Sequence, residues 1–210
     1  MDRHAQRANL LCSSAQAMGL NLGSEQVEQL LAFIALIDKW NRTHNLTAIT
    51  DIDEMLVKHL LDSLSIARFI PTGDILDVGT GAGLPAVPLS IVSTNNIFTL
   101  VDSSQKRIGF LKEVKRKLAL TNILPVHARV EDFAGGHYAA ITSRAFSSLA
   151  QMLAQTEHLL ADNGSWLAMK GNYPEQEIAE LDDRYKVVDS TALQVPGLDA
   201  QRYLIQIQHC

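Results

Sequence analysis

Three glycines at alternate positions mark the stretch of this chain best suited to binding chemistry. Residues 75–85 have the sequence ILDVGTGAGLP, in which Gly79, Gly81 and Gly83 follow a short apolar run that contains Asp77. Glycine tolerates positive φ and lets a ligand approach the backbone, and Pro85 suits the first turn of a helix, whose free N–H groups attract anions. The pattern predicts a strand, a tight turn and a helix start that bind a nucleotide-type cofactor. A glycine-rich turn without a ligand is the alternative.

The spacing of the glycines separates two cofactor classes. The dinucleotide fingerprint needs glycine at the first, third and sixth places of the turn, but Leu84 occupies the sixth place and the third glycine is at position 83. This disfavours a pyrophosphate and hence a Rossmann-type oxidoreductase. A GxGxG turn after a strand is typical of class I S-adenosylmethionine (SAM) methyltransferases.

A second acid favours a ligand that contains ribose. The apolar residues 97–101 predict a strand that ends at Asp102. A carboxylate at this place can accept hydrogen bonds from both ribose hydroxyls, as in NAD enzymes. Asp102 could instead cap the following helix, and it does not select a particular cofactor.

The elements around these residues alternate between apolar strands and helices from residue 73 onward. Strands are expected at 75–78, 97–101, 123–128, 138–142 and 166–169, helices at 85–92, at 104–120 and from Arg144 to about 160, and a terminal hairpin at 185–188 and 203–208. This alternation predicts an α/β fold, Rossmann-like, with a mostly parallel sheet, helices on both faces and an antiparallel strand near the C-terminus.

A helical region precedes the first strand. Helices are expected at 3–18, from an N-cap at Ser24 to about residue 40, and at 53–69, where Leu56, Leu60 and Leu64 have the spacing of a buried stripe. The spacing puts Lys58, His59 and Asp62 on the other faces of that helix. We therefore expect two parts: residues 1–72 as a helical extension packed on the core, and residues 73–210 as the SAM-binding domain.

The composition is that of a globular chain. It has 210 residues, 47% of them hydrophobic and 20% charged, which suits one large domain or a domain with an appendage. The longest apolar run, residues 30–37, is too short to span a bilayer, and no apolar leader segment follows the first residues. The two cysteines, Cys12 and Cys210, have no metal-ligand spacing. We expect a cytoplasmic, metal-free protein.

The net charge and its distribution along the chain give opposite indications about nucleic-acid binding. The net charge of −5 is a mild argument against a protein that coats nucleic acid. The predicted helix at 104–120, however, carries six basic residues and one acid, Glu113: Lys106, Arg107, Lys112, Lys115, Arg116 and Lys117. This helix presents either a solvated face or a docking surface for RNA.

Ligands of open α/β sheets bind beyond the carboxyl ends of the strands. The residues just after each predicted strand are therefore the candidates for the site, and we expect them to converge on one cleft: residues 77–84, Asp102, Val130, Glu131, Ser143, Arg144 and Lys170.

An ordered set of short motifs closely resembles the bacterial glucose-inhibited division protein B family. The set comprises GTGAGLP at 79–85, LVDS at 100–103 with KR at 106–107, RVE at 129–131 and SRAF at 143–146. It continues upstream at 40–47 and 59–63 and downstream at 170–171 and 193–199. No single motif is specific, but the ordered set covers nearly the whole chain after about residue 25. Ala86 departs from the glycine expected there.

The resemblance implies an activity and residue roles. The family methylates N7 of a guanine in 16S ribosomal RNA (nucleotide 527, in the 530 loop) with SAM as co-substrate, acting on the RNA or the small ribosomal subunit. The implied cofactor-binding residues are Asp77, Gly79, Gly81, Gly83, Leu84, Asp102, Val130, Glu131 and Arg144. Among these, Val130 and Glu131 would hold the adenine and its amino group, and Arg144 would face the methionine end.

The residues present fit an N7 acceptor. Carbon-5 methylation of a pyrimidine needs a cysteine nucleophile, and neither cysteine lies in the predicted cleft. The Asn/Asp-Pro-Pro-aromatic element typical of exocyclic amine methylation is replaced by SRAF at 143–146. Guanine N7 has a free lone pair and needs no general base. Arg144 and Lys170 are then expected to position the acceptor, and Phe146 to stack on the base or to belong to the core.

Three other readings remain open from the sequence. The chain could be a class I methyltransferase with a protein or small-molecule acceptor, an oxidoreductase, or a non-catalytic SAM-binding assembly factor. The sequence leaves the oligomeric state open, with a monomer favoured.

Overall fold

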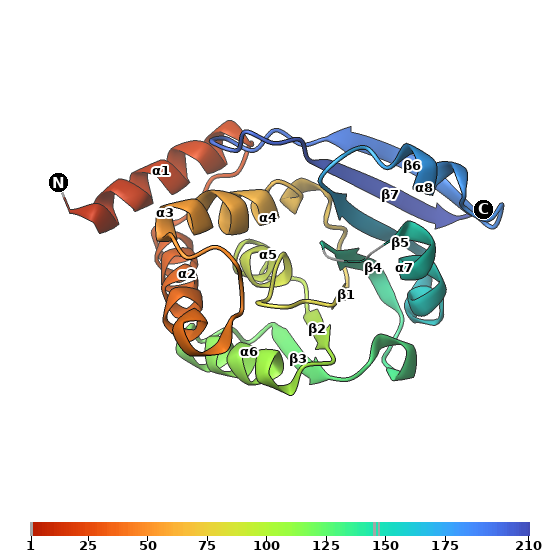
Figure 1. Ribbon diagram of the computed structural model, residues 1–210, viewed down its shortest axis with the longest axis horizontal. Helices are drawn as coiled ribbons and strands as arrows, with labels where there is room; N and C mark the ends of the chain where they lie inside the picture. The colour runs from red at the N-terminus through yellow and green to blue at the C-terminus, as the bar shows by residue number, and fades with distance from the viewer. Residues whose placement is uncertain (1, 145, 147) are drawn as a thin grey trace.

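The computed structural model describes residues 2–144, 146 and 148–210. It contains a seven-stranded sheet in the order β3-β2-β1-β4-β5-β7-β6 (Figure 1). Ala145, within the SRAF motif, lies outside the described residues. The strands are β1 (Ile75–Val78), β2 (Phe98–Asp102), β3 (Ile123–His127), β4 (Tyr138–Ser143), β5 (Leu160–Lys170), β6 (Tyr185–Ala192) and β7 (Tyr203–His209). The helices are α1 (Arg3–Ala17), α2 (Ser24–His44), α3 (Ile52–Met55), α4 (Asp62–Leu64), α5 (Ala86–Val92), α6 (Gln105–Lys117), α7 (Leu149–Thr156) and α8 (Glu175–Ala179).

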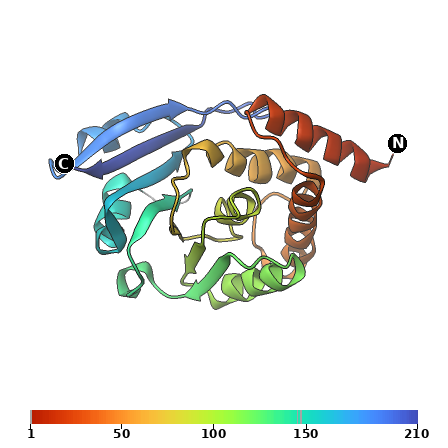
Figure 2. The same ribbon diagram turned by 180° about the vertical axis from the view of Figure 1, so that it is seen from behind.

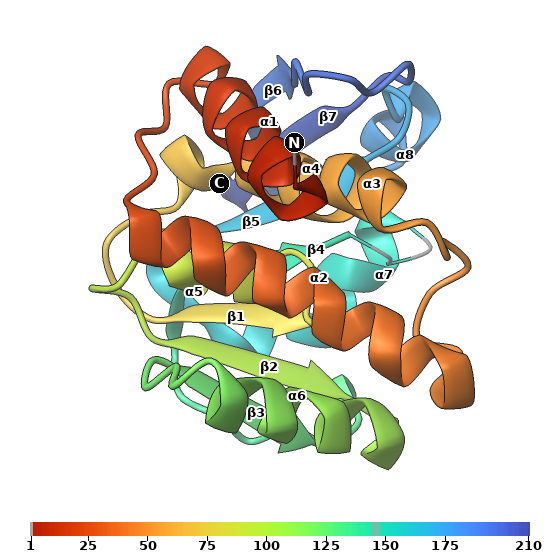
Figure 3. The same ribbon diagram turned by 90° about the vertical axis from the view of Figure 1, so that its left-hand side faces the viewer.

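The first five strands are parallel, and their carboxyl ends lie at one edge of the sheet. β1 is fully buried and pairs with β2 on one side and β4 on the other. Figure 3 shows β1 and β2 pointing the same way beneath α2. The central position of β1 places the glycine turn that follows it midway along this edge, where ligands of open α/β sheets bind.

Helices cover both faces of the sheet, as expected. One apolar cluster joins α1, α2, α5 and α6 to one face and includes Phe33, Ile75 and Phe110. A second cluster joins α7 to the opposite face around Trp166. Figure 2 shows the sheet and the helices on its two faces from behind. The burial of side chains on both faces explains why β1 and β2 are mostly apolar and buried along their whole length.

The helical region before β1 differs from the sequence prediction in its winding. The expected helix at 53–69 consists of α3, a π-helical segment Leu56–Leu61, α4 and a 3-10 turn Ala67–Phe69. π-helical winding shifts the phase of the side chains relative to a 3.6-residue repeat. His59 and Asp62, expected on the outer faces, are in fact 3% and 2% exposed. At the start of α2, Gly23 and not Ser24 is the N-cap.

The C-terminal strands form the expected hairpin at the sheet edge. β7 pairs antiparallel with both β5 and β6. β5 begins earlier than predicted, at Leu160, and a register shift against Tyr138 and Ala140 of β4 accommodates the extra residues. The short helix α8 was not predicted. In the described part of the chain, no helix is long and apolar enough to cross a membrane.

Candidate functional site

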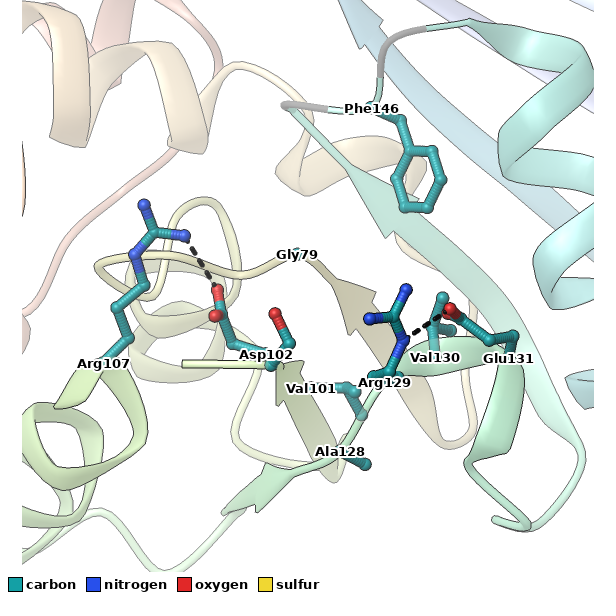
Figure 4. A pocket seen from close by; sticks show the side chains of 10 residues that line it. Gly79, Val101, Asp102, Arg107, Ala128, Arg129, Val130, Glu131 and Phe146 are labelled. Carbon is teal, nitrogen blue, oxygen red and sulfur yellow. Dashed lines mark hydrogen bonds and ion pairs between the residues drawn. The ribbon is translucent and has the colours of Figure 1, made fainter. Parts of the chain in front are cut away.

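A pocket lies at the carboxyl ends of β1, β2 and β3 and is partly open to solvent (Figure 4). Its cavity volume is about 220 Å³, somewhat below the roughly 300–1,000 Å³ of closed small-molecule sites. We call it the first pocket. Four of the predicted cofactor-binding residues line it, namely Gly79, Asp102, Val130 and Glu131, together with Val101, Ser103, Arg107, Ala128, Arg129 and Phe146.

The glycine turn forms one wall of the first pocket, and its glycines have different physical requirements. All three have positive φ, at 63° for Gly79, 60° for Gly81 and 87° for Gly83. A Cβ on Gly79 would meet no atom within 4 Å, whereas one on Gly83 would lie 2.6 Å from Val87 and 2.7 Å from a Leu111 methyl. Gly79 therefore leaves space, and Gly83 lets α5 and α6 pack against the turn.

Asp102 ties the turn to β2. Its Oδ2 accepts hydrogen bonds from Gly81 N at 2.9 Å and Arg107 Nη1 at 3.3 Å, and its Oδ1 accepts one from Ser104 N at 2.8 Å. The N-cap of α6 is Ser104, so Asp102 does not have the alternative capping role. A carboxylate offers about four acceptor positions, and Asp102, which is 4% exposed, still lines the pocket.

Asp77 lies beneath the turn and does not reach the pocket. It accepts hydrogen bonds from Thr80 Oγ1 at 2.6 Å and Thr142 Oγ1 at 3.1 Å. Complete burial raises the pKa of the Asp77 carboxyl to about 6, against the lowering effect of these hydrogen bonds and of one from the Ala86 backbone. The geometry gives Asp77 a role in holding β1, β4 and the turn together. Leu84 is also buried, with its side chain in the core.

At the opposite wall, Val130 and Glu131 form a 3-10 turn after β3. Val130 is 9% exposed and offers an apolar surface. The amide of Glu131 itself and then the Arg129 guanidinium hold the pKa of the Glu131 carboxyl below its usual range. An ionised carboxylate there is an acceptor for a ligand N–H. Phe146 is partly buried and overhangs the pocket (Figure 4), so it is neither wholly core nor wholly exposed.

Arg144 and Lys170 line a second pocket, at the ends of β4 and β5. The two pockets share no lining residue, and the candidates expected in one cleft are distributed between them. Arg144 Nη1 donates to the Lys58 carbonyl at 3.0 Å and to Asp62 Oδ2 at 3.2 Å. Lys170 Nζ donates to Glu177 at 2.8 Å. Only one residue separates Arg144 in the sequence from Phe146 of the first pocket.

Several lining residues of the second pocket were not predicted. They are Ile49, Lys58, His59, Asp62, Met169, Gly171 and Arg202. Burial, and after it the Arg144 charge, lower the pKa of His59 to about 4. His59 Nε2 lies 3.0 Å from the Thr47 hydroxyl. The motif at 59–63, singled out by the resemblance, was the available signal for His59 and Asp62.

The fold and the first pocket define the class of protein, the class I methyltransferases. Solved structures of this class superpose on the chain at low sequence identity. The M1A22 tRNA methyltransferase TrmK of B. subtilis has a TM-score of 0.57 and 16% identity, over 71% of this chain and 66% of its own. M. jannaschii TYW2, solved in complex with AdoMet, has a TM-score of 0.55 and 14% identity, over 71% and 75%.

Sequence comparison identifies the family. The model of the GidB family, described as rRNA small subunit methyltransferase G, matches residues 26–205. The ribosomal RNA small subunit methyltransferase G of Escherichia coli O17:K52:H18 is 44% identical over 95% of this chain and 97% of its own. The protein of that name from Idiomarina loihiensis is 43% identical over 90% and 92%. The chain belongs to the rRNA small subunit methyltransferase G family, which confirms the resemblance.

Proposed function

We propose that this chain transfers the methyl group of SAM to N7 of one guanine in 16S ribosomal RNA, nucleotide 527 in the 530 loop. The observation that carries the proposal is the family match across residues 26–205, joined to a pocket at the carboxyl edge of a class I methyltransferase sheet. With a ribosomal acceptor, we expect this activity in the cytoplasm.

The residues that line the first pocket suit SAM in their chemistry. Glu131 would accept a hydrogen bond from the adenine amino group while Val130 packs against the ring. Asp102 would accept ribose hydroxyls, and the space above Gly79 would hold the sulfonium end. These roles are supported by the carboxylates of Asp102 and Glu131, which line the pocket, and by the open space at Gly79.

Methyl transfer to N7 depends mainly on the alignment of the acceptor nitrogen with the methyl carbon of SAM. Attack of the N7 lone pair on the methyl carbon breaks the carbon–sulfur bond in line, so no proton has to be removed before the transfer. The sulfonium loses its positive charge as the purine gains one. Arg144 and Lys170, in the second pocket, would position the RNA. The resemblance implies a different role for Arg144, at the methionine end of SAM.

The test is to map N7-methylguanine in 16S ribosomal RNA from cells with and without the gene for this protein. We expect one methylated guanine to disappear and to return when purified protein and SAM are added to the unmethylated subunits or RNA. An unchanged map together with methyl transfer to a protein or small molecule would overturn the acceptor. SAM binding without any transfer would indicate an assembly factor.

A further inference from the structure

The second pocket contains a buried carboxylate that accepts hydrogen bonds from two arginines. Asp62 is 2% exposed and accepts hydrogen bonds from Arg144 Nη1 at 3.2 Å and Arg202 Nε at 2.8 Å. The side chains of Arg144 and Arg202 are themselves only 26% and 24% exposed. One carboxylate compensates one of these two charges, and a largely buried charge without a counter-charge is costly.

The lysines in the pocket do not change this balance. Lys170 pairs with Glu177, and Lys58 pairs with Glu54 one helical turn away. Each lysine therefore has a carboxylate of its own, outside the pocket lining. The uncompensated positive charge lies with the two arginines, which Asp62 holds beside each other, although they come from segments far apart in the sequence.

We infer that the second pocket binds one phosphodiester group of the acceptor RNA between Arg144 and Arg202, with Asp62 as the positioning residue that fixes both guanidinium groups. This inference rests on the proposed function. Guanidinium groups suit phosphate because several N–H donors can face its oxygens at once. A phosphate at the ends of β4 and β5 would place the attached nucleotide next to the first pocket.

The carboxylate of the SAM methionine is the other anion available at this edge. The phosphodiester is favoured because the second pocket shares no residue with the first. Arg202 also comes from the loop before β7, outside the strands that frame the glycine turn. The two assignments predict different effects of substituting Arg202: a phosphodiester site predicts weaker RNA binding, and a methionine carboxylate site predicts weaker SAM binding.

The decisive variant is Arg202→Gln, which leaves Asp62 paired with Arg144. The control is Arg184→Gln, because Arg184 is an exposed arginine paired with Asp182 and Glu157, away from both pockets. Binding to a 16S ribosomal RNA transcript is measured over a range of salt concentrations, and SAM affinity is measured by calorimetry. We expect Arg202→Gln to lose roughly tenfold in RNA affinity at low salt and to lower the salt slope by about 1, with SAM affinity unchanged. Arg184→Gln should match the wild type.

One further variant keeps the test independent of folding. Arg202→Lys retains the charge and should restore the salt slope, and the melting temperatures of both Arg202 variants are measured alongside. A lower melting temperature with an unaltered salt slope would overturn the inference, because Arg202 would then only tether the C-terminal hairpin.

The remaining outcomes separate the inference from the proposed function. A loss of SAM affinity with unaltered RNA binding would assign the pocket to the cofactor carboxylate and overturn the inference alone. A wild-type protein that methylates no ribosomal RNA would overturn the proposed function, and the inference with it.

Discussion

Gly79 is the residue at which a single added side chain would test the cofactor site most directly. Its φ of 63° favours glycine, and the space in front of it belongs to the first pocket. A side chain at this position meets no protein atom within 4 Å, so apart from the backbone strain at positive φ, the obstacle that it creates is to a ligand.

The variant Gly79→Asp is expected to abolish SAM binding, because it puts both volume and a negative charge into the pocket. Calorimetric titration with SAM measures the effect. Gly109→Asp, at an exposed site in α6 that is also free of contacts within 4 Å, is the matched control and should bind SAM like the wild type. Undiminished affinity in Gly79→Asp would refute this placement of the site.

Two buried groups have pKa shifts in opposite directions. The pKa of Asp77 rises from 3.8 to about 6, and that of His59 falls from 6.5 to about 4. Folded Asp77 holds its proton more tightly than the unfolded chain does, so its contribution to stability increases as pH falls from 6 to 4. Folded His59 holds its proton less tightly, so stability decreases as pH falls from 6.5 to 4. Each effect amounts to about 3 kcal/mol.

These effects nearly cancel in the wild type, and single variants should separate them. Between pH 6.5 and pH 4, the free energy of unfolding of Asp77→Asn should fall by up to about 3 kcal/mol relative to the wild type. That of His59→Gln should rise by a similar amount. Urea denaturation at several pH values measures both. Parallel curves for all three proteins would show that neither group titrates in this range.

At the level of single elements, the position of α6 bears on the two roles predicted for its basic residues, a solvated face and a docking surface for RNA. The helix starts beside the first pocket, where Arg107 pairs with Asp102, and then runs toward the opposite edge of the sheet. Two of its later cations have partners: Lys115 donates to the Ile123 carbonyl, and Arg116 pairs with Glu113. We therefore expect the docking surface for RNA, if α6 contributes one, at the start of the helix beside the first pocket.

Opposite ends of α6 give a matched pair of variants. Lys106→Glu, at the exposed start, should weaken binding to ribosomal RNA and reduce the salt slope by about 1. Lys117→Glu, at the exposed end, should have no effect, because it lies toward the edge of the sheet away from the site. Salt-dependent RNA binding of both variants is the measurement. If both variants bind RNA with the affinity and salt slope of the wild type, α6 presents only a solvated face.

At the scale of the whole molecule, the N-terminal helices and the sheet share one apolar core. Phe33 of α2 stacks with Phe110 of α6 at 6.5 Å between ring centroids, and both are fully buried. Shared burial of this kind couples the unfolding of the joined parts. We propose that the helical extension 1–72 and the domain 73–210 unfold as one unit.

The two tryptophans report on the two parts separately. Trp40 in α2 contacts Phe110, and Trp166 in β5 is fully buried against the opposite face of the sheet. Fluorescence of Trp40→Phe and Trp166→Phe as a function of urea should show the tryptophan that remains in each variant changing in one cooperative transition, coincident with loss of circular dichroism. A fluorescence transition of Trp40 at clearly lower urea than that of Trp166 would show that the helical extension melts first.

The alternation of strands and helices, the glycine turn, the terminal hairpin and, through the ordered motifs, the family could all be predicted from the sequence. These features depend on local spacing: alternate glycines permit positive φ, and apolar runs bury themselves in a parallel sheet. Four residues of the first pocket, Gly79, Asp102, Val130 and Glu131, followed from the single rule that ligands bind beyond the strand ends.

The second pocket could be recognised only in the folded protein. Helical periodicity placed His59 and Asp62 outside, but the π-helical winding of residues 56–61 and the contacts of Asp62 with Arg144 and Arg202 put them inside. Asp62 and Arg202 are 140 positions apart in the chain. A contact over such a separation leaves no periodic signal in one sequence, because it depends on how the folded sheet brings its last loop back to the first helices.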